Sequence, residues 1–591
     1  MPRNIMMIGL VLSLLFFSCR PRVVSGLSES IGESAANEFV DSITKDINLF
    51  GNAKSEEEKD IISQRVWTRI VEVYQRNPAM LRANLQKLIL KSVSESSSQA
   101  VKDLVTRETL DLVFDTIEVQ IQNQNRFISW NSIKNAMLER PLPDRLQSIN
   151  DLKTNLQNLI GAAGSFLPYD GEFSVLASSS GPYKKLDLLI HGKESWEYRH
   201  ELMSSAKKNL WISSWAFYDD LETGKKAVQK LAQLKSKGVD VRVVVDGIVS
   251  KRVGHDAITT SIVNLGIPVI RWQHPKFLGF GMHRKIMIID SGTDREKLIL
   301  GGKNFGNNYS HLKPPIDSNA TDTEIRADLR GRWRDTDIVV SGTQASVAAA
   351  QFAKAWNQYV SIINPASGLS LIPDSNSALK SVPINNNSKN YVAILDHDPS
   401  ENINSGKFVD PIYETTIHLI RSATASIKIS NAYFILTEPL FAALVEAMNR
   451  GVHVEIHTNS QHSMDEADRP LLGPIYRSLR AVLNVPEAQK QASFKQPSVY
   501  LQKGRTLHSK YLVIDDRAGW VSSYNIHPRS ARYESEVAAV FLGQETGNDL
   551  SKMFSLDVAP DLAPIVEDIQ TVTLPPSQLF DVIEKIIFEQ L

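Results

Sequence analysis

The sequence contains a single cysteine, Cys19, so no internal disulfide can form. It also lacks a charge imbalance: 65 Lys and Arg residues against 66 Asp and Glu residues give a net charge of −1 at pH 7. A near-neutral chain has no overall electrostatic attraction to nucleic acid, although local basic patches are not excluded. With 42% hydrophobic and 22% charged residues, the composition is that of a globular protein and excludes a disordered or fibrous one.

Long apolar runs are scarce as well. The run from Ile5 to Phe17 is too short to span a bilayer comfortably, and it ends just before Cys19, where a signal peptide would be cut. Residues 1–19 therefore resemble a bacterial lipoprotein signal, with Cys19 as the lipid-carrying first residue of the mature protein. A plain secretory signal or an uncleaved anchor is the alternative. The pattern predicts a membrane-anchored lipoprotein of the bacterial cell envelope that faces the periplasm, with the outer membrane favoured over the inner.

The 591 residues are enough for about three domains, and the first of them is predicted to be all-α. Residues 27–166 contain few Gly or Pro, and segments such as 61–74, 81–93 and 110–121 repeat apolar residues at a spacing of three and four. No catalytic constellation stands out in this region. We therefore interpret residues 27–166 as a packing or spacer domain.

From residue 168 onwards, predicted strands and helices alternate, and the pattern occurs twice. A strand, a helix closed by Gly238 and a second strand are predicted at 210–212, 225–237 and 239–245. The same order returns around Gly451, with segments at 427–430, 440–450 and 452–456. Each glycine stands where a helix needs a left-handed cap. Features that repeat at almost one offset favour duplicated α/β sandwich domains, which we place at 168–365 and 390–591.

Three other segments are predicted from composition. Residues 364–390 are rich in Ser, Asn and Pro, which is typical of a linker. Residues 313–332 form a polar loop that could cover a nearby site, although an ordinary surface loop is the favoured interpretation. Residues 577–591 are predicted to form a short amphipathic helix that docks onto the second domain.

Two stretches carry the chemistry, and each reads His-x-Lys, four mostly apolar residues, then Asp. The first runs from His283 to Asp290 and the second from His508 to Asp515. Both apolar runs are short and aliphatic, as buried strands are. Side chains alternate along a strand, so we expect His and Lys, two residues apart, to point the same way.

Each motif is followed by a second apolar run and a polar turn that contains an asparagine, Asn304 in the first copy and Asn525 in the second. An imidazole, an ammonium group and an amide would thus gather in each copy. Such a group suits a phosphodiester, because a nucleophile or acid then lies beside donors that can hold phosphate oxygens.

These residues resemble the phospholipase D superfamily, particularly its bacterial cardiolipin synthase and phospholipase branch. Besides the two motifs, residues 301–309 and 333–337 are similar to the first half of that branch, and residues 523–530 with Glu536 to the second. The resemblance covers roughly residues 180–365 and 390–545. One His-x-Lys motif would be a weak signal, but two with matching Asn and acidic residues are strong.

The resemblance implies two tandem phospholipase D-like α/β sandwich domains in a pseudo-twofold arrangement, preceded by the all-α domain. It places one phosphate between both histidines. His283 would attack phosphorus to form a phosphohistidine, and His508 would protonate the departing alcohol, although the near symmetry of the motifs leaves an exchange of these roles open.

The resemblance assigns further roles. Asp335 and Glu536 would orient the imidazoles from behind. Asp290 and Asp515, at the far ends of their strands, are predicted to be structural. No metal or other cofactor is expected, because lysines and amides would supply the positive field. The groups expected to bind the non-bridging phosphate oxygens are Lys285, Lys510, Asn304 and Asn525.

The sequence departs from the family pattern at three positions. Ser522 stands where Gly is usual, His527 where Asp is frequent, and Glu534 where Asn is frequent. None of these residues is a predicted proton or phosphate group, so we expect altered packing or substrate fit rather than loss of activity. The other histidines, among them His311 and His453, His457 and His527, show no repeated partner pattern and are interpreted as surface or core residues.

The predicted function is a phospholipase D-like phosphodiesterase that cleaves phospholipid headgroups at a phospholipid membrane surface. A cardiolipin synthase-type phosphatidyltransferase is the alternative, and the choice depends on whether water or an alcohol accepts the phosphatidyl group. The lack of a pair of N-terminal membrane helices favours hydrolysis slightly. A nuclease of the same superfamily and a non-catalytic binding protein are less favoured, and no nucleic-acid partner is expected. The sequence does not indicate the oligomeric state.

Overall fold

The computed structural model describes most of both α/β halves and only short parts of the chain before them. The described residues are 42, 45–46, 49, 56–76, 153–154, 156, 167–168, 173–174, 192–252, 254–275, 280–310, 333–341, 343–363, 369–373, 390–405, 408–460, 463–464, 471–502 and 506–558. The predicted signal, the 313–332 loop and the 577–591 helix lie outside these residues. Most of the predicted linker and of the predicted N-terminal domain also lie outside them.

One long helix, α3 (Glu56–Arg76), is described within the predicted N-terminal domain. Its buried side chains recur at the helical spacing that the sequence indicated, namely Ile62, Val66, Trp67 and Ile70. Among the helices in the described part of the chain, none combines the length and the apolar character needed to cross a bilayer.

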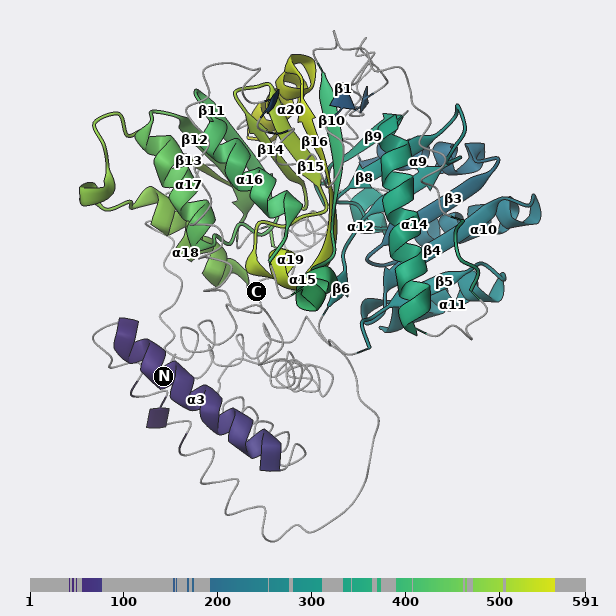
Figure 1. The fold of residues 1–591 in the computed structure, drawn as a ribbon, viewed down its shortest axis with the longest axis horizontal. Coiled ribbons are helices and arrows are strands. Elements are labelled where there is room, and N and C mark those ends of the chain that lie inside the picture. The colour runs from purple at the N-terminus through teal and green to yellow at the C-terminus, as the bar shows by residue number, and fades with distance from the viewer. Residues whose placement is uncertain are drawn as a thin grey trace, which may run out of the picture. The chain divides into compact units, whose positions relative to one another are not determined.

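The first half of the remaining chain forms a seven-stranded sheet with the order β2-β9-β8-β7-β3-β4-β5 (Figure 1). Its strands are β2 (Phe173–Ser174), β3 (Asn209–Ser214), β4 (Asp240–Asp246), β5 (Val269–Trp272), β7 (Ile286–Ile289), β8 (Lys297–Gly301) and β9 (Asp337–Ser341). Its helices are α9 (Gly192–Ser205), α10 (Lys226–Ser236), α11 (Asp256–Asn264), α12 (Asn307–Ser310) and α14 (Thr343–Ile363), with a π turn at Leu221–Lys225 and a 3-10 turn at Val249–Lys251.

The second half repeats this order. Its path β10-β16-β15-β14-β11-β12-β13 matches the first sheet strand for strand, and β1 extends the β10 edge. The strands are β1 (Leu167–Pro168), β6 (Gly281–Met282), β10 (Tyr391–His397), β11 (Ser426–Asn431), β12 (His453–Asn459), β13 (Ser498–Gln502), β14 (Lys510–Ile514), β15 (Ala518–Ser522) and β16 (Glu534–Leu542). The helices are α15 (Pro399–Ser405), α16 (Pro411–Ser422), α17 (Glu438–Asn449), α18 (Leu472–Leu483), α19 (Pro528–Tyr533) and α20 (Gln544–Asp557), with a 3-10 turn at Glu487–Gln489. The predicted pair of α/β halves is confirmed.

Both glycine caps take the predicted conformation, because Gly238 has φ 80° and Gly451 has φ 85°. In each half the strand after the glycine pairs in parallel with the strand before the helix: β4 with β3, and β12 with β11. The motif strands β7 and β14 pair antiparallel with the other side of β3 and β11. The hairpins that carry the two motifs therefore occupy matching places in the two sheets.

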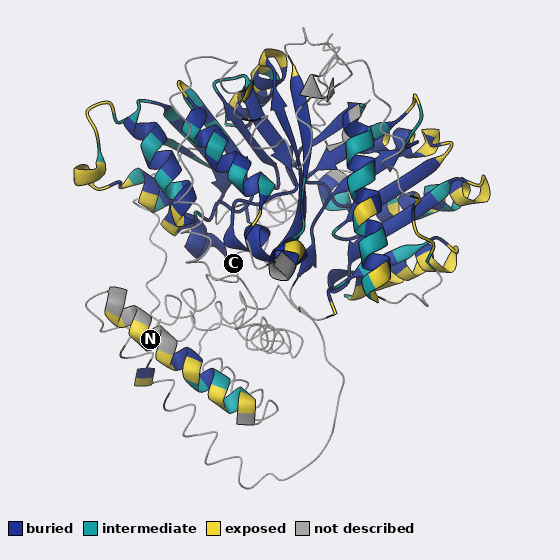
Figure 2. Ribbon diagram, in the orientation of Figure 1, coloured by how far each residue is buried: buried dark blue, intermediate teal, exposed yellow. Residues whose placement is uncertain are grey.

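The strands are buried on both faces, so each face carries its own core (Figure 2). On β3, Leu210 and Ile212 pack on one face with residues of α9, α10 and α11. Trp211, between them, points to the other face, where it stacks on Phe352 of α14 with ring centroids 5.6 Å apart. This second core also contains strand residues of the second sheet and residues of α20. A shared hydrophobic core therefore joins the two halves.

Backbone pairing also crosses between the halves. β6 belongs to the first half in sequence, yet it pairs in parallel with β16, with Gly281 opposite Glu534 and Met282 opposite Ser535. β1, at the start of the predicted first domain, pairs with β10 of the second sheet. The chain segments of the two halves are thus interleaved at their contact.

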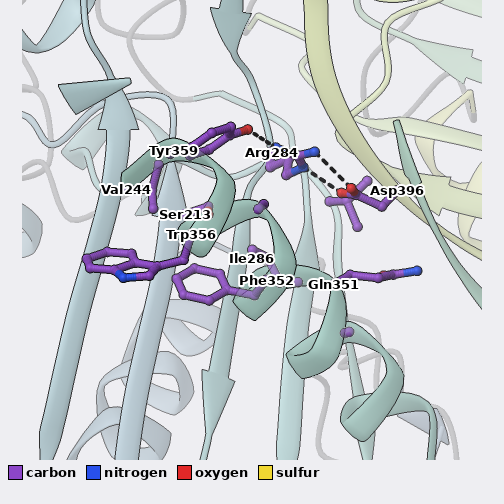
Figure 3. A pocket seen from close by; sticks show the side chains of 12 residues that line it. Ser213, Val244, Arg284, Ile286, Gln351, Phe352, Trp356, Tyr359 and Asp396 are labelled. Carbon is purple, nitrogen blue, oxygen red and sulfur yellow. Dashed lines mark hydrogen bonds and ion pairs between the residues drawn. The ribbon is translucent and has the colours of Figure 1, made fainter. Parts of the chain in front are cut away.

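Two buried arginines of the first half bind carboxylates of the second. Arg334 is fully buried and binds Asp557 of α20 through Nε and one terminal nitrogen, both at 2.8 Å. Arg284, between the motif His and Lys, binds Asp396 of β10 and donates to the Tyr359 hydroxyl on α14 (Figure 3). A cavity of about 10 Å³, room for one water molecule, lies beside this second cluster. Paired charges of this kind fix the relative position of the two halves.

Asp557→Asn is expected to lower the free energy of unfolding by roughly 3–5 kcal/mol, because it leaves the Arg334 guanidinium buried without its counter-charge. Urea unfolding measures the change. Lys354→Ala, which removes an exposed pair with Glu401, is the control and should cost less than about 1 kcal/mol. Equal effects of the two variants would contradict the role given to the buried pair.

Candidate active site

The two motif histidines lie in short extended segments just before β7 and β14. The sequence placed His and Lys inside a strand, but β7 begins at Ile286, three residues after His283, and β14 begins at Lys510, two residues after His508. His283 donates its backbone N–H to the Ser535 carbonyl at 3.0 Å, and His508 donates to the Arg334 carbonyl at 2.6 Å. Each histidine is therefore anchored by backbone of the opposite half.

The side chains cross in the same way. The Nδ1 atom of His283 lies 2.9 Å from Oε1 of Glu536, a second-half residue. The Nδ1 atom of His508 lies 2.7 Å from Oδ2 of Asp335, a first-half residue. A carboxylate at Nδ1 favours the tautomer that carries its proton there, which leaves Nε2 with a lone pair. The sequence indicated acids behind the histidines, but not that each acid serves the histidine of the other half.

The two imidazoles share the charges of both motif lysines. Burial lowers the pKa of His283 well below its usual value, and Lys285, Lys510 and His508 lower it further. Burial and the Lys510 charge lower the pKa of His508 to about 4, although Asp335 opposes this shift. Because His508 and Lys510 act on His283, the two motifs meet in one charged environment. In the free protein both rings are neutral near pH 7.

The two acidic partners differ in charge state. Burial alone would raise the pKa of Asp335, but the neighbouring His508 and Lys510 hold it below its usual value. Burial and the adjacent Glu534 carboxylate raise the pKa of Glu536 well above its usual value. The two His–carboxylate pairs are therefore geometrically alike and electrostatically unequal.

Each motif lysine donates to the carbonyl oxygen of its own histidine: Lys285 at 2.7 Å, and Lys510 to His508. An ammonium group has three N–H donors, so it can make further hydrogen bonds besides this one. Burial lowers the pKa of Lys285 to about 7, with Glu536 opposing the shift. An anion in the site would stabilise the charged form of this lysine.

The two asparagines differ in their contacts. Asn304 accepts from the Trp215 N–H at 3.1 Å and donates to the Tyr309 hydroxyl at 2.9 Å, so protein groups use both ends of its amide. The side-chain oxygen of Asn525 is buried with no hydrogen-bond partner among the described residues. Phosphate binding by either amide stays a prediction.

The motif aspartates lie at the opposite ends of the motif strands. Asp290 and Asp515 both adopt positive φ, 52° and 50°. The Asp290 carboxylate accepts from the backbone N–H groups of Lys207 and Lys208, each at 2.7 Å. Asp515 accepts from three consecutive N–H groups in the turn before β11. Each aspartate therefore connects its motif strand to the chain that enters the neighbouring strand.

Ser522, His527 and Glu534, the three departures from the family pattern, are all buried. His527 and Glu534 lie near His283. Ser522 accepts from the Tyr524 N–H at 3.1 Å. His527 caps α19, because its Nδ1 accepts from the Ser530 N–H at 3.0 Å. Glu534 lies 3.8 Å from Nδ1 of His283. Sequence reasoning treated Glu534 as a change in packing or substrate fit, although its position two residues before Glu536 was a usable signal.

Aromatic rings surround His508, and sequence reasoning did not single them out. The Trp333 and Tyr309 rings of the first half lie 5.1 and 5.2 Å from the His508 ring, and Tyr433 lies 6.5 Å from it. Trp215 makes an edge contact with His283 at 6.3 Å. These rings therefore pack around the two imidazoles.

Two of the other described histidines, His453 and His457, have hydrogen-bond partners nearby. His457 is fully buried between Ser430 and Gln502, and His453 contacts Ser498. His311 lies outside the described residues. One group in the described part of the chain has the spacing of metal ligands, formed by His283, Glu534 and Glu536 within 4.8 Å of one another. The absence of a metal and of other cofactors stays a prediction.

Comparisons with known proteins agree with this geometry. Residues 200–327 and 416–558 match the family described as "Cardiolipin synthase, PLD-like domain". Both segments are therefore similar to the phospholipase D-like domains of cardiolipin synthases. The resemblance predicted from the motifs is confirmed, and the chain is an enzyme of the phospholipase D type.

Relatives of this phospholipase D-like enzyme are bacterial. Cardiolipin synthase A of Pseudomonas fluorescens is 24% identical over 66% of this chain and 71% of its own length. Cardiolipin synthase A of Pseudomonas putida is 25% identical over 67% of this chain and 72% of its own length. The crystal structure of a phosphatidylserine synthase from Haemophilus influenzae has the same fold, with a TM-score of 0.50, 14% identity and coverage of 75% of this chain and 97% of that one.

The buried histidines predict acid sensitivity. Burial lowers the pKa of His527 to about 4, so between pH 6.5 and 4 the unfolded chain binds a proton that the folded enzyme does not. Stability should therefore fall as the pH drops through this window. His527→Asn retains an N-cap side chain but cannot titrate, and should recover about 2 kcal/mol of the loss at pH 4.5.

Melting temperatures between pH 7.5 and 4.5 measure this effect. His453→Asn, at a half-buried histidine away from the site, is the control and should keep the slope of the parent enzyme. Parallel slopes for all three proteins would show that His527 does not contribute.

Proposed function

We propose that this enzyme transfers the phosphatidyl group of a phospholipid to an acceptor hydroxyl through a phosphohistidine. The crossed pairs His283–Glu536 and His508–Asp335 carry the proposal. They supply two oriented, neutral imidazoles in one environment, one to attack phosphorus and one to move protons. Two buried motif lysines supply positive charge for the non-bridging oxygens.

The first step breaks the bond between phosphorus and the headgroup oxygen. Nε2 of His283 attacks phosphorus, the N–P bond forms, and the headgroup alcohol leaves with a proton from Nε2 of His508. His508 holds that proton only when substrate is bound, because the diester anion offsets the nearby Lys510 charge that lowers its pKa. Glu536 keeps the His283 ring in the attacking tautomer.

The second step breaks the N–P bond and forms a bond between phosphorus and the acceptor oxygen. His508 removes the proton from the acceptor hydroxyl, whose oxygen attacks phosphorus, and the N–P bond breaks. Water as the acceptor gives phosphatidic acid. A phosphatidylglycerol hydroxyl gives cardiolipin. The cardiolipin synthases among the relatives support the alcohol, while the sequence alone favoured water.

The lipid product shows whether water or a phosphatidylglycerol hydroxyl is the acceptor. Purified enzyme with phosphatidylglycerol or phosphatidylcholine vesicles is expected to release the headgroup, and mass spectrometry of the lipids identifies phosphatidic acid or cardiolipin. Cleavage of single-stranded or plasmid DNA with intact phospholipid would overturn the lipid assignment in favour of a nuclease. The net charge of −1 argues against that outcome.

His283→Ala and His508→Ala are each expected to lower turnover by roughly 10³-fold or more, because each removes a group that no neighbour replaces. Asp335→Asn should cost about as much, since an amide at Nδ1 stabilises the wrong tautomer of His508. Circular dichroism checks that the variants fold. Turnover retained in both alanine variants would remove the mechanism.

We also propose that the enzyme is a lipoprotein of the bacterial envelope, anchored through Cys19 and facing the periplasm, with the outer membrane favoured. This rests on the apolar run that ends before the only cysteine. Cys19→Ser is expected to abolish incorporation of labelled palmitate and to release the protein from the membrane fraction. Membrane association that survives this change would require another anchor.

A further inference from the structure

The two halves of the active site correspond position by position, which makes their differences informative. Met282, before the first histidine, pairs in parallel with Ser535, and Leu507, before the second, pairs in parallel with Arg334. Ser535 precedes Glu536, and Arg334 precedes Asp335. The residue one place earlier is Glu534 in one half and Trp333 in the other.

These two corresponding residues approach opposite histidines. Glu534 places a carboxylate oxygen 3.8 Å from Nδ1 of His283, whereas Trp333 places a neutral ring 5.1 Å from the His508 ring. Two acidic side chains, Glu536 and Glu534, therefore lie near Nδ1 of His283. His508 has one, Asp335, at its own Nδ1.

Glu534 is built into the site. It is 5% exposed, and its Oε1 accepts from Nε of Arg529 at 2.8 Å. The Ser530 hydroxyl lies 3.2 Å from Glu534 and 2.7 Å from Glu536, so it joins the two carboxylates. Burial would raise the pKa of Glu534, but the Arg529 guanidinium and His527 hold it below its usual value. Glu534 is thus a fixed negative charge.

We propose that Glu534 is a positioning residue that acts through His283 and makes the two histidines chemically unequal. Its carboxylate stabilises positive charge on the His283 ring. That charge develops when the Nε2–P bond forms and the bond to the headgroup oxygen breaks, while His508 gives its proton to the departing oxygen. The step itself belongs to the proposed function, on which this inference rests. At the corresponding position Trp333 gives the His508 ring an aromatic neighbour and no second carboxylate.

Other charged groups face the same ring and remain in place when Glu534 is changed. They come from both motifs, from the start of α19 and from β16, and are Lys285, His508, Lys510, His527 and Glu536. Asp246 of β4 also binds this region, since its carboxylate accepts the Met282 N–H at 2.9 Å. Glu534→Gln also removes the charge that helps to raise the pKa of Glu536, so the measured effect of Glu534 includes this change in its neighbour.

Glu534→Gln is expected to lower kcat about tenfold, the equivalent of one pKa unit, without changing KM for the lipid, because the buried side chain supports the ring. The acid limb of the kcat/KM profile should move to lower pH. Without the carboxylate, the imidazolium form of His283 is less stable, so the attacking neutral form persists further into acid. Glu534→Asp keeps the charge and should restore much of the rate.

The direction in which the acid limb of the kcat/KM profile moves distinguishes a positioning role of Glu534 from a purely structural one. A variant that merely folds less well loses activity in acid, which moves the limb to higher pH. Glu446→Gln, which breaks the Arg421–Glu446 pair between α16 and α17, is the matched control for loss of an ion pair. It should leave the rate and the limb unchanged. A limb in Glu534→Gln that stays in place or moves upwards would overturn the proposal.

The assays use phosphatidylglycerol vesicles and, in parallel, bis(p-nitrophenyl) phosphate, a small chromogenic phosphodiester. If the wild-type enzyme cleaves only the chromogenic diester, the lipid assignment fails while the role of Glu534 is tested on that substrate. If the wild-type enzyme cleaves neither, both proposals are overturned. Cleavage of both, with the expected shift in Glu534→Gln, supports both.

Discussion

Each motif histidine depends on a carboxylate from the other half of the chain. Glu536 binds His283 and Asp335 binds His508, so neither half holds a complete His–acid pair. The backbone repeats the exchange, since each histidine N–H donates to a carbonyl of the opposite half. A displacement of the halves by about one ångström would lengthen both hydrogen bonds beyond useful geometry. The position of one half against the other is thus a condition for the chemistry.

The contact between the halves is built to hold that position. Arg334 and Arg284 come from the segments that also carry Asp335 and His283, and each binds carboxylates of the second half. Charges buried this deeply are costly unless paired, so a displaced arrangement is strongly disfavoured. The shared core of the two sheets contributes non-directional burial, and the ion pairs select one register within it. The same residues that place the site therefore also fix the fold around it.

Much of the fold could be predicted because its signals are local. The alternation of strands and helices, the caps at Gly238 and Gly451, and the two motifs follow from short stretches of sequence. The crossing of the acids could not be predicted from them, because it depends on how strands far apart in the chain approach one another. Glu534 was visible only as a departure from a pattern. Its meaning required the pairing of β6 with β16, which brings it to His283.

The presence of both halves in one chain has a consequence for how the site can change. In a homodimer of identical subunits, positions 333 and 534 would be encoded once and would carry the same residue on both sides of the twofold axis. Here Trp333 and Glu534 are independent. Covalent tandem duplication therefore frees each side of the axis to specialise, and the surroundings of the two motif histidines can change separately.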